Sequence, residues 1–142
     1  MPEISVIIPV YNLENDICQM LMSVKGQSFK DFEAIVIDDG SSDHSYERMC
    51  SVLSDDSRFR IFKQGNYGVS AARNRGMELA QGKYIIFFDG DDHIPQKSLE
   101  NMYASIVSDN FDMTVGIMTT YNYGKASVNR QSKALSKKRK ID

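Results

Sequence analysis

The chain has 142 residues, of which 42% are hydrophobic and 25% charged, an ordinary composition for one globular domain. Its formal charge of −2 creates no overall positive field, so we expect no nucleic-acid partner. No apolar run approaches the roughly 20 residues of a membrane span, and Met1-Pro2-Glu3 enters a strand directly, so we expect no signal peptide. Cys18 and Cys50 fall in predicted helices without metal-binding spacing, and we expect buried, reduced thiols in a cytoplasmic protein.

The first part of the chain alternates β-branched apolar runs with apolar residues at helical spacing. Asn12 is the predicted cap of the first helix, and Gly26 ends it. In order, we predict a strand at 4–10, a helix at about 13–25, a strand at 32–37, a helix around 46–53, a strand at 59–63 and a helix from 69 to about 81. This repeated alternation predicts an α/β fold with a mainly parallel sheet flanked by helices.

The run from Tyr84 to Phe88 is continuously apolar, which favours a central strand covered on both faces. It ends in Asp89-Gly90-Asp91-Asp92, at the sheet edge where open α/β sheets bind ligands. In an extended segment Asp89 and Asp91 would point the same way and share one ligand. Crowded carboxylates repel one another unless a cation compensates, and oxygen ligands favour Mg²⁺, Mn²⁺ or Ca²⁺. The alternative is a solvated acidic turn; an EF-hand is rejected because Ile94 occupies the required glycine position.

The C-terminal part is predicted to contain one more helix and one more strand before the sequence becomes polar. Pro95 suits the first turn of the helix, and residues 112–120 favour a fifth strand. We place the domain at 1–122 and a basic, flexible tail at 123–142, with five positive charges in the eight residues from Lys133 to Lys140. A solvated tail is the first interpretation, and peripheral contact with an anionic inner-membrane surface is the alternative.

Unusual side chains follow three of the predicted strands and would meet in one crevice. Tyr11 offers an aromatic face for a planar ring, and the Asp39 carboxylate can accept from a base N–H. Arg73, near the start of the third helix, can meet phosphate oxygens. Each residue also has a plain alternative, namely packing for Tyr11, helix capping for Asp39 and a surface ion pair for Arg73. Together with the acidic cluster, they describe a site for a nucleoside diphosphate and a metal.

Four segments carry a resemblance to a known family: SVIIPVYN, DFEAIVIDDGSSD, NYGVSAARNRG and GKYIIFFDGDD. In order and spacing they resemble the consecutive motifs of family 2 glycosyltransferases, which have the GT-A fold. The resemblance runs from about Ile4 into the fourth predicted helix. It implies inverting transfer of a sugar from a nucleoside diphosphate donor, usually a UDP-sugar, to the hydroxyl of a saccharide or lipid-linked acceptor, as in polysaccharide or glycoconjugate synthesis.

The same resemblance implies roles for individual residues. Pro9 and Tyr11 would hold the nucleobase and Asp39 would bind its edge, while Arg73 would lie near the donor. The segment 89–91 matches the DxD motif of the family, so that Asp91 would bind Mn²⁺ or Mg²⁺ directly and Asp89 would support the ribose or the metal. The metal would neutralise charge on the leaving diphosphate.

The chain departs from the family pattern in its length. Family members continue into a second half that forms the acceptor site and supplies the general base, and neither Asp109 nor Asp112 matches that base. We therefore expect the nucleotide-binding part, either as a fragment or as a short gene product. A binding module without turnover is one alternative. A receiver domain using Asp38, Asp39 and Asp89 is another, and a nucleotidyltransferase is disfavoured because PVYNLEND is neither glycine-rich nor basic.

Overall fold

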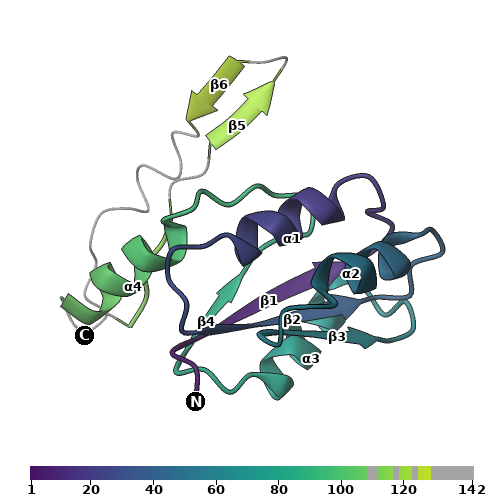
Figure 1. Cartoon of the computed structure of the whole chain (residues 1–142), viewed down its shortest axis with the longest axis horizontal. Helices are drawn as coiled ribbons and strands as arrows, with labels where there is room; N and C mark the ends of the chain where they lie inside the picture. Colours follow the sequence, from purple (N-terminus) through teal and green to yellow (C-terminus); the bar gives the residue numbers. More distant parts are fainter. Residues whose placement is uncertain (109–111, 117–118, 123–124, 129–142) are drawn as a thin grey trace. The chain divides into compact units, whose positions relative to one another are not determined.

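The computed structural model describes residues 1–108, 112–116, 119–122 and 125–128 (Figure 1). The chain divides into two compact units, Met1–Gln96 and Lys97–Asp142. The first contains β1 (Ile4–Val10), α1 (Ile17–Lys25), β2 (Phe32–Asp38), α2 (Ser45–Leu53), β3 (Phe59–Lys63), α3 (Val69–Leu79) and β4 (Tyr84–Phe87). The second contains α4 (Ser98–Ser108), β5 (Thr119–Asn122) and β6 (Lys125–Val128).

The first unit is built on a four-stranded parallel sheet with the order β3-β2-β1-β4. The register runs from Ile4 opposite Phe32 to Val10 opposite Asp38, so the loops after β1 and β2 leave the sheet side by side. Helices α1 and α2 lie on one face of the sheet and α3 on the other (Figure 1). This arrangement confirms the predicted α/β class and its parallel sheet.

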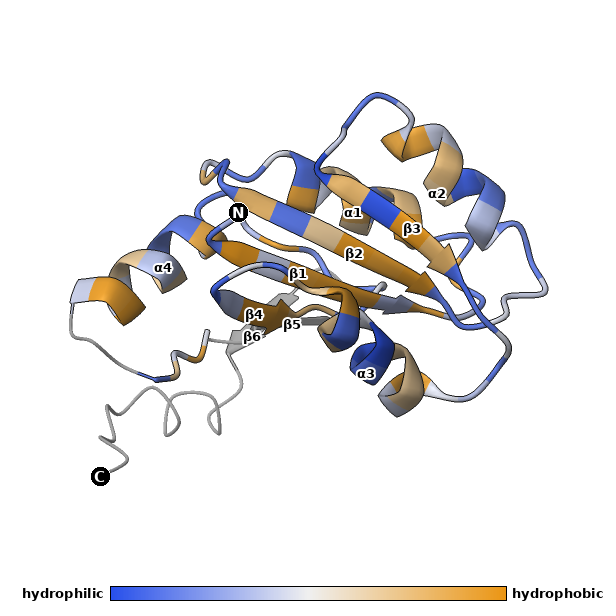
Figure 2. Cartoon of the chain, turned by 90° about the horizontal axis from the view of Figure 1, so that it is seen from below, coloured by the Kyte–Doolittle hydropathy of each residue, from blue (hydrophilic) through white to orange (hydrophobic). Residues whose placement is uncertain are grey.

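Burial explains why the two central strands lack an alternating pattern. All seven residues of β1 and all seven of β2 are buried, because helices cover both faces of these strands. Both strands carry mostly hydrophobic colours in Figure 2. Helix α3 packs closely on the sheet at Gly76, where a Cβ atom would lie 2.4 Å from Ile7 Cγ2. A larger residue at this position would force the helix away from β1.

A buried carboxylate joins the strands at the amino edge of the sheet, opposite the loops that follow the strands. Glu33 accepts hydrogen bonds from Ser5 Oγ at 2.7 Å, from the Gln81 N–H at 2.6 Å and from Arg60 at 2.7 Å. Burial by itself would raise the pKa of Glu33, but these hydrogen bonds and the Arg60 charge together lower it. The ionised group therefore ties β1, β2, β3 and the segment before β4 together.

Strand β4 differs from the prediction of a central, doubly covered strand. Within the described residues it lies at the edge of the four-stranded sheet, and Ile85 and Phe87 are 44% and 41% exposed. The apolar run does form a parallel strand beside β1, but composition does not determine which strand takes the edge. Asp89 to Asp92 form a turn closed by the Asp92 N–H and the Asp89 carbonyl at 3.1 Å, so the two-residue alternation of an extended strand does not apply there.

The second unit corrects the prediction of a strand over 112–120. Residues 112–116 are not in a strand, and β5 pairs in antiparallel fashion with β6. The reason is that Thr119–Asn122 finds a partner a few residues further along the chain, at Lys125–Val128. Strand β6 falls within the segment 123–142 that was predicted to be a flexible tail. Residues 129–142 lie outside the described residues. The domain boundary proposed at residue 122 therefore stays a prediction.

Three smaller expectations also change. Asn12 does not cap α1, whose N-cap is Asp16, and Pro95 precedes α4 rather than forming its first turn. Both cysteines are free, but Cys18 is only partly buried and Cys50 is exposed. Helix α2 buries one face, formed by Ser45, Met49 and Leu53, and Cys50 does not lie on that face. None of the described helices has the length and apolar character that a membrane crossing requires.

Candidate functional site

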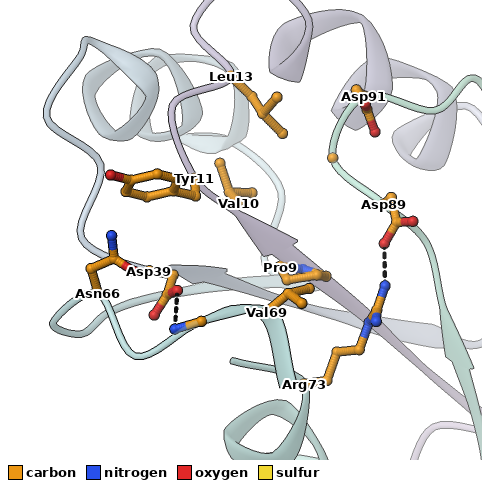
Figure 3. A pocket seen from close by; sticks show the side chains of 12 residues that line it. Pro9, Val10, Tyr11, Leu13, Asp39, Asn66, Val69, Arg73, Asp89 and Asp91 are labelled. Atoms are coloured by element: carbon orange, nitrogen blue, oxygen red, sulfur yellow. Dashed lines mark hydrogen bonds and ion pairs between the residues drawn. The ribbon is translucent and has the colours of Figure 1, made fainter. Parts of the chain in front are cut away.

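A cleft of about 420 Å³ lies at the carboxyl edge of the sheet, within the first unit. The loops that follow all four strands contribute to it, since parallel strands bring these loops to one edge. Twelve residues line the cleft, ten of which are labelled in Figure 3: Pro9, Val10, Tyr11, Leu13, Asp39, Asn66, Gly68, Val69, Arg73, Asp89, Gly90 and Asp91.

One end of the cleft is formed by the ends of β1 and β2. Pro9 belongs to β1, and the Tyr11 ring follows it with 46% of its surface exposed. A backbone hydrogen bond of 2.8 Å from the Asp39 N–H to the Val10 carbonyl continues the β1–β2 ladder to the cleft. Tyr11 therefore presents an accessible aromatic face from a well-fixed strand end.

Asp39 is buried, with 3% of its surface exposed, and organises the loop before α3. Its Oδ1 accepts from Gln64 Nε2 at 2.8 Å and from the Tyr67 N–H at 3.0 Å. Its Oδ2 accepts from the Gly68 N–H at 2.8 Å, at the N-cap of α3. Since a carboxylate has about four acceptor positions, about one position on Oδ2 remains for a ligand. Asp39 thus holds the residues that lead into α3, rather than capping the helix that follows it in sequence.

The loop after β2 and the loop before α3 approach each other closely behind Asp39. Gly40 has a φ of +75°, which favours glycine, and a Cβ at this position would lie 2.8 Å from the Asn66 backbone nitrogen. This contact fixes the position of Asn66 on the cleft wall. In Figure 3 the Asn66 side chain lies near Tyr11 and Asp39.

The opposite end of the cleft is formed by α3 and the acidic turn after β4. Arg73 extends from α3 toward the turn, and its Nη2 donates to Asp89 Oδ1 at 2.5 Å (Figure 3). The Arg73 Nε atom is buried without a hydrogen-bond partner. Arg73 therefore already neutralises Asp89, and it retains a donor that is not used within the described residues.

Asp91 differs from Asp89 because its carboxylate makes no hydrogen bond or ion pair with any described residue. Desolvation, followed by the charges of Asp89 and Asp91, raises the pKa of the neighbouring Asp92. The turn is therefore an accumulation of negative charge that Arg73 only partly offsets. Among the described residues no group of three or more His, Cys, Asp or Glu side chains is arranged to hold a metal ion. A cation here would need further oxygen ligands from a bound molecule or from water.

The six residues predicted for the site, Pro9, Tyr11, Asp39, Arg73, Asp89 and Asp91, all line this one cleft. Their binding roles stay predictions. Leu13, Asn66 and Val69 also line the cleft but were not predicted as site residues. The signal that could have identified Asn66 is its position in a glycine-flanked loop after the strand beside β2.

The fold and the position of the cleft define a class of protein. A parallel sheet with the order 3-2-1-4 and a cleft at the carboxyl ends of its strands is typical of nucleotide-binding α/β domains. Receiver domains instead have the order 2-1-3-4-5, so the receiver interpretation is wrong. The complete burial of Asp38 and the three donors on Asp39 also prevent an open acidic pair.

Comparison with known proteins identifies the family. Residues 5–142 match the family model for glycosyl transferase family 2, and the chain belongs to this family. An uncharacterized glycosyltransferase of Haemophilus influenzae is 40% identical over 144 residues, covering 100% of this chain and 56% of the relative. The cholesterol galactosyltransferase of Borreliella burgdorferi is 40% identical over 111 residues, covering 78% of this chain and 31% of the relative. The chain therefore spans about half, or less, of the length of these relatives.

Solved structures confirm the predicted GT-A fold. The structure of S. aureus TarS 1-349 in complex with UDP-GlcNAc aligns with a TM-score of 0.72 and 29% identity, over 79% of this chain and 33% of that one. The mannosyltransferase PcManGT from Pyrobaculum calidifontis, in complex with GDP-Man and Mn²⁺, aligns with a TM-score of 0.68 and 23% identity, over 82% of this chain and 34% of that one. The second likeness concerns the fold alone.

Proposed function

We propose that the cleft binds a nucleoside diphosphate sugar, specifically a UDP-sugar, together with Mn²⁺ or Mg²⁺. In this proposal the chain is the donor-binding part of an inverting glycosyltransferase. That enzyme transfers the sugar to a hydroxyl of a saccharide or lipid-linked acceptor, in polysaccharide or glycoconjugate synthesis in the cytoplasm. The observation that supports the proposal most strongly is that an aromatic face, a buried acceptor, an arginine and a free carboxylate line one cleft. The UDP-GlcNAc complex of TarS, a related GT-A protein, supports the choice of donor.

At the β1–β2 end of the cleft, the Tyr11 ring would stack on the base while Pro9 would line its other side. The acceptor position that remains on Asp39 Oδ2 suits a single base N–H such as N3–H of uracil. The other three positions of this carboxylate are used by Gln64, Tyr67 and Gly68. Preorganised in this way, Asp39 would bind the base without having to reorient.

At the acidic end, Asp91 would be the direct ligand of the divalent ion, because its carboxylate is free whereas Asp89 is paired with Arg73. The donor diphosphate would supply further hard oxygen ligands. When bound, the ion would supply charge neutralisation at the leaving diphosphate. Asp89 would support the ribose and hold Arg73 in place, and the unused Nε–H of Arg73 would be available to a phosphate oxygen.

Calorimetric titration of the chain with UDP in the presence of Mn²⁺ tests this proposal. We expect a binding heat that largely disappears in Asp91→Ala and weakens in Asp39→Ala. Asp92→Asn is the matched control, since it removes a neighbouring charge without removing the proposed ligand. Equal binding by the parent and both site variants, or an equal loss in Asp92→Asn, would count against the assignment of the site.

A binding module without turnover is the second candidate for the residues described here. The chain spans 56% of the Haemophilus influenzae relative. In addition, neither Asp109 nor Asp112 matches the general base that the family resemblance implies. We expect the chain to bind UDP and Mn²⁺ but to release little or no UDP from UDP-sugars. Sugar-dependent release of UDP at an appreciable rate would instead place the whole catalytic apparatus within these 142 residues.

A further inference from the structure

Two neighbouring loops contribute Tyr11, Leu13 and Asp39 to the cleft and are hydrogen-bonded to each other away from it. One is the β1–α1 loop at 11–16 and the other the β2–α2 loop at 39–44. Their proximity follows from the parallel pairing of β1 and β2, which extends to Val10 opposite Asp38. Neither loop has regular secondary structure, so their backbone polar groups need other partners.

Backbone N–H groups of the first loop donate to side chains at the start of α2 and in the second loop. The bonds run from Asn12 to Ser41 Oγ at 3.0 Å, from Leu13 to Ser45 Oγ at 2.8 Å and from Glu14 to Asp43 Oδ2 at 3.1 Å. In the other direction, the Ser42 N–H donates to Asn12 Oδ1 at 2.8 Å and the His44 N–H to Glu14 Oε2 at 3.1 Å. We call the side chains of Asn12, Glu14, Ser41, Asp43 and Ser45 the loop clamp.

Asp43 is the central acceptor of the loop clamp. Its Oδ1 accepts from Ser45 Oγ at 2.6 Å and from the Ser45 N–H at 3.0 Å, while Oδ2 accepts from Glu14. Desolvation of Asp43 opposes ionisation, but the bonds from Ser45 and Glu14 lower its pKa. The carboxylate therefore stays charged at neutral pH and holds both loops.

Asn12 has a φ of +51°, and among the described residues it is the only non-glycine residue with a positive φ. This left-handed conformation is unfavourable for most side chains, although asparagine tolerates it better than most. The bond from Ser42 to its side chain holds the residue in this conformation. Residues held in such conformations often lie at functional sites, because the surrounding structure must enforce them.

The consequence of this conformation lies in the cleft. The side chains of the loop clamp do not line the cleft, whereas Tyr11 and Leu13, on either side of Asn12, do. Leu13 reaches the acidic turn: a Cβ on Gly90 would lie 2.7 Å from Leu13 Cδ1. The backbone path through Asn12 thus determines where the aromatic ring of Tyr11 lies and how closely the loop approaches the turn.

We propose that Asn12 and the rest of the loop clamp are positioning residues that preorganise Tyr11 to receive the nucleobase. The inference rests on the proposed function, because it assumes that a base lies against Tyr11. Without the clamp, the loop would populate several conformations, and the apparent affinity would fall in proportion to the competent fraction. The effect should fall mainly on the base, because no clamp side chain bonds to Arg73 or Asp91, and the loop meets the acidic turn through the apolar side chain of Leu13.

The test compares two probes in the presence of Mn²⁺, UDP and inorganic pyrophosphate, by calorimetry on the whole chain. Asn12→Ala should weaken UDP binding about tenfold, since alanine disfavours a positive φ and cannot accept from Ser42. Pyrophosphate binding should change less than about twofold. Asn12→Asp keeps the acceptor and tolerates the left-handed conformation, so it should bind UDP nearly as well as the parent.

The same measurement in a Tyr11→Ala background separates positioning from a general structural role. In that background Asn12→Ala should have little further effect on UDP affinity, because the ring that it positions is absent. Three results would each overturn the inference. The first is an equal loss of affinity for UDP and pyrophosphate, and the second is additive losses of UDP affinity in the double variant. The third is a lower unfolding free energy with unchanged UDP affinity. If the parent itself fails to bind UDP with Mn²⁺, the proposed function fails as well. If the parent binds UDP but Asn12→Ala has no effect, only the positioning role of the loop clamp is refuted.

Discussion

Replacing Asp39 by Asn tests how far one carboxylate maintains the cleft. The two oxygens of Asp39 accept from three donors, Gln64 Nε2 and the N–H groups of Tyr67 and Gly68. An asparagine side chain has one oxygen, and its amide group would face at least one of these N–H groups as a second donor. At least one of the two backbone N–H groups, whose bonds to Asp39 are part-buried, would therefore lose its acceptor.

The expected cost has two parts. An N–H that loses its acceptor costs about 1–3 kcal/mol when it is buried, and the lower end of this range applies to the part-buried N–H groups of Tyr67 and Gly68. Loss of negative charge beside the N-terminus of α3 adds about 0.3–1 kcal/mol. We therefore expect Asp39→Asn to lower the free energy of unfolding by about 1.3–4 kcal/mol, toward the lower end of this range.

Urea unfolding followed by circular dichroism measures this change, with Asp31→Asn as the matched control. Asp31 is exposed, and its carboxylate makes no hydrogen bond with a described residue, so its replacement should change the unfolding free energy by no more than about 0.5 kcal/mol. If Asp39→Asn also stayed within that limit, the carboxylate could not be the organiser of the loop at 64–68.

Three further predictions concern packing, acid stability and the tail. Gly76→Ala should destabilise the fold by about 1–2 kcal/mol in urea unfolding, because crowding against Ile7 exceeds the gain in helix propensity. The control Glu78→Ala, at an exposed position of α3, should leave the unfolding free energy nearly unchanged. Because the pKa of Glu33 is held below its ordinary 4.5, the stabilisation from the ionised group is present above that pH and is lost as the pH falls through the lower folded value. Urea unfolding over an acid pH series should therefore show less acid sensitivity in Glu33→Gln than in the parent. Deleting residues 133–142 should reduce co-sedimentation with anionic liposomes if the basic segment contacts membranes, and unchanged co-sedimentation would favour the solvated tail.

The features that the sequence predicted well depend on local pattern. The apolar runs of β1 and β2 indicated buried strands, and the parallel alternation brought the loops after the strands to one edge. For this reason the sequence alone predicts that Tyr11, Asp39 and Asp91 share one cleft, as the structure shows.

The features that it missed depend on contacts between distant residues. The donors to Asp39 come from residues 25 to 29 positions later, so its role at α3 depends on the pairing of β2 with β3. Asn12 resembles a helix cap in sequence, but a bond from Ser42, 30 residues away, gives it another role. Likewise, the apolar run of β4 is compatible with either a central or an edge position, and only the strand order decides between them.

The most direct test of the central claim locates bound Mn²⁺ by its paramagnetic broadening of backbone amide signals, with and without UDP. With both present, we expect the signals of residues 89–92 and of Arg73 to broaden most, while that of Glu33, at the other edge of the sheet, persists. The broadening should be lost in Asp91→Ala. Broadening centred on another acidic segment, such as Asp55-Asp56, or broadening that does not depend on UDP, would contradict a donor site built on the acidic turn after β4.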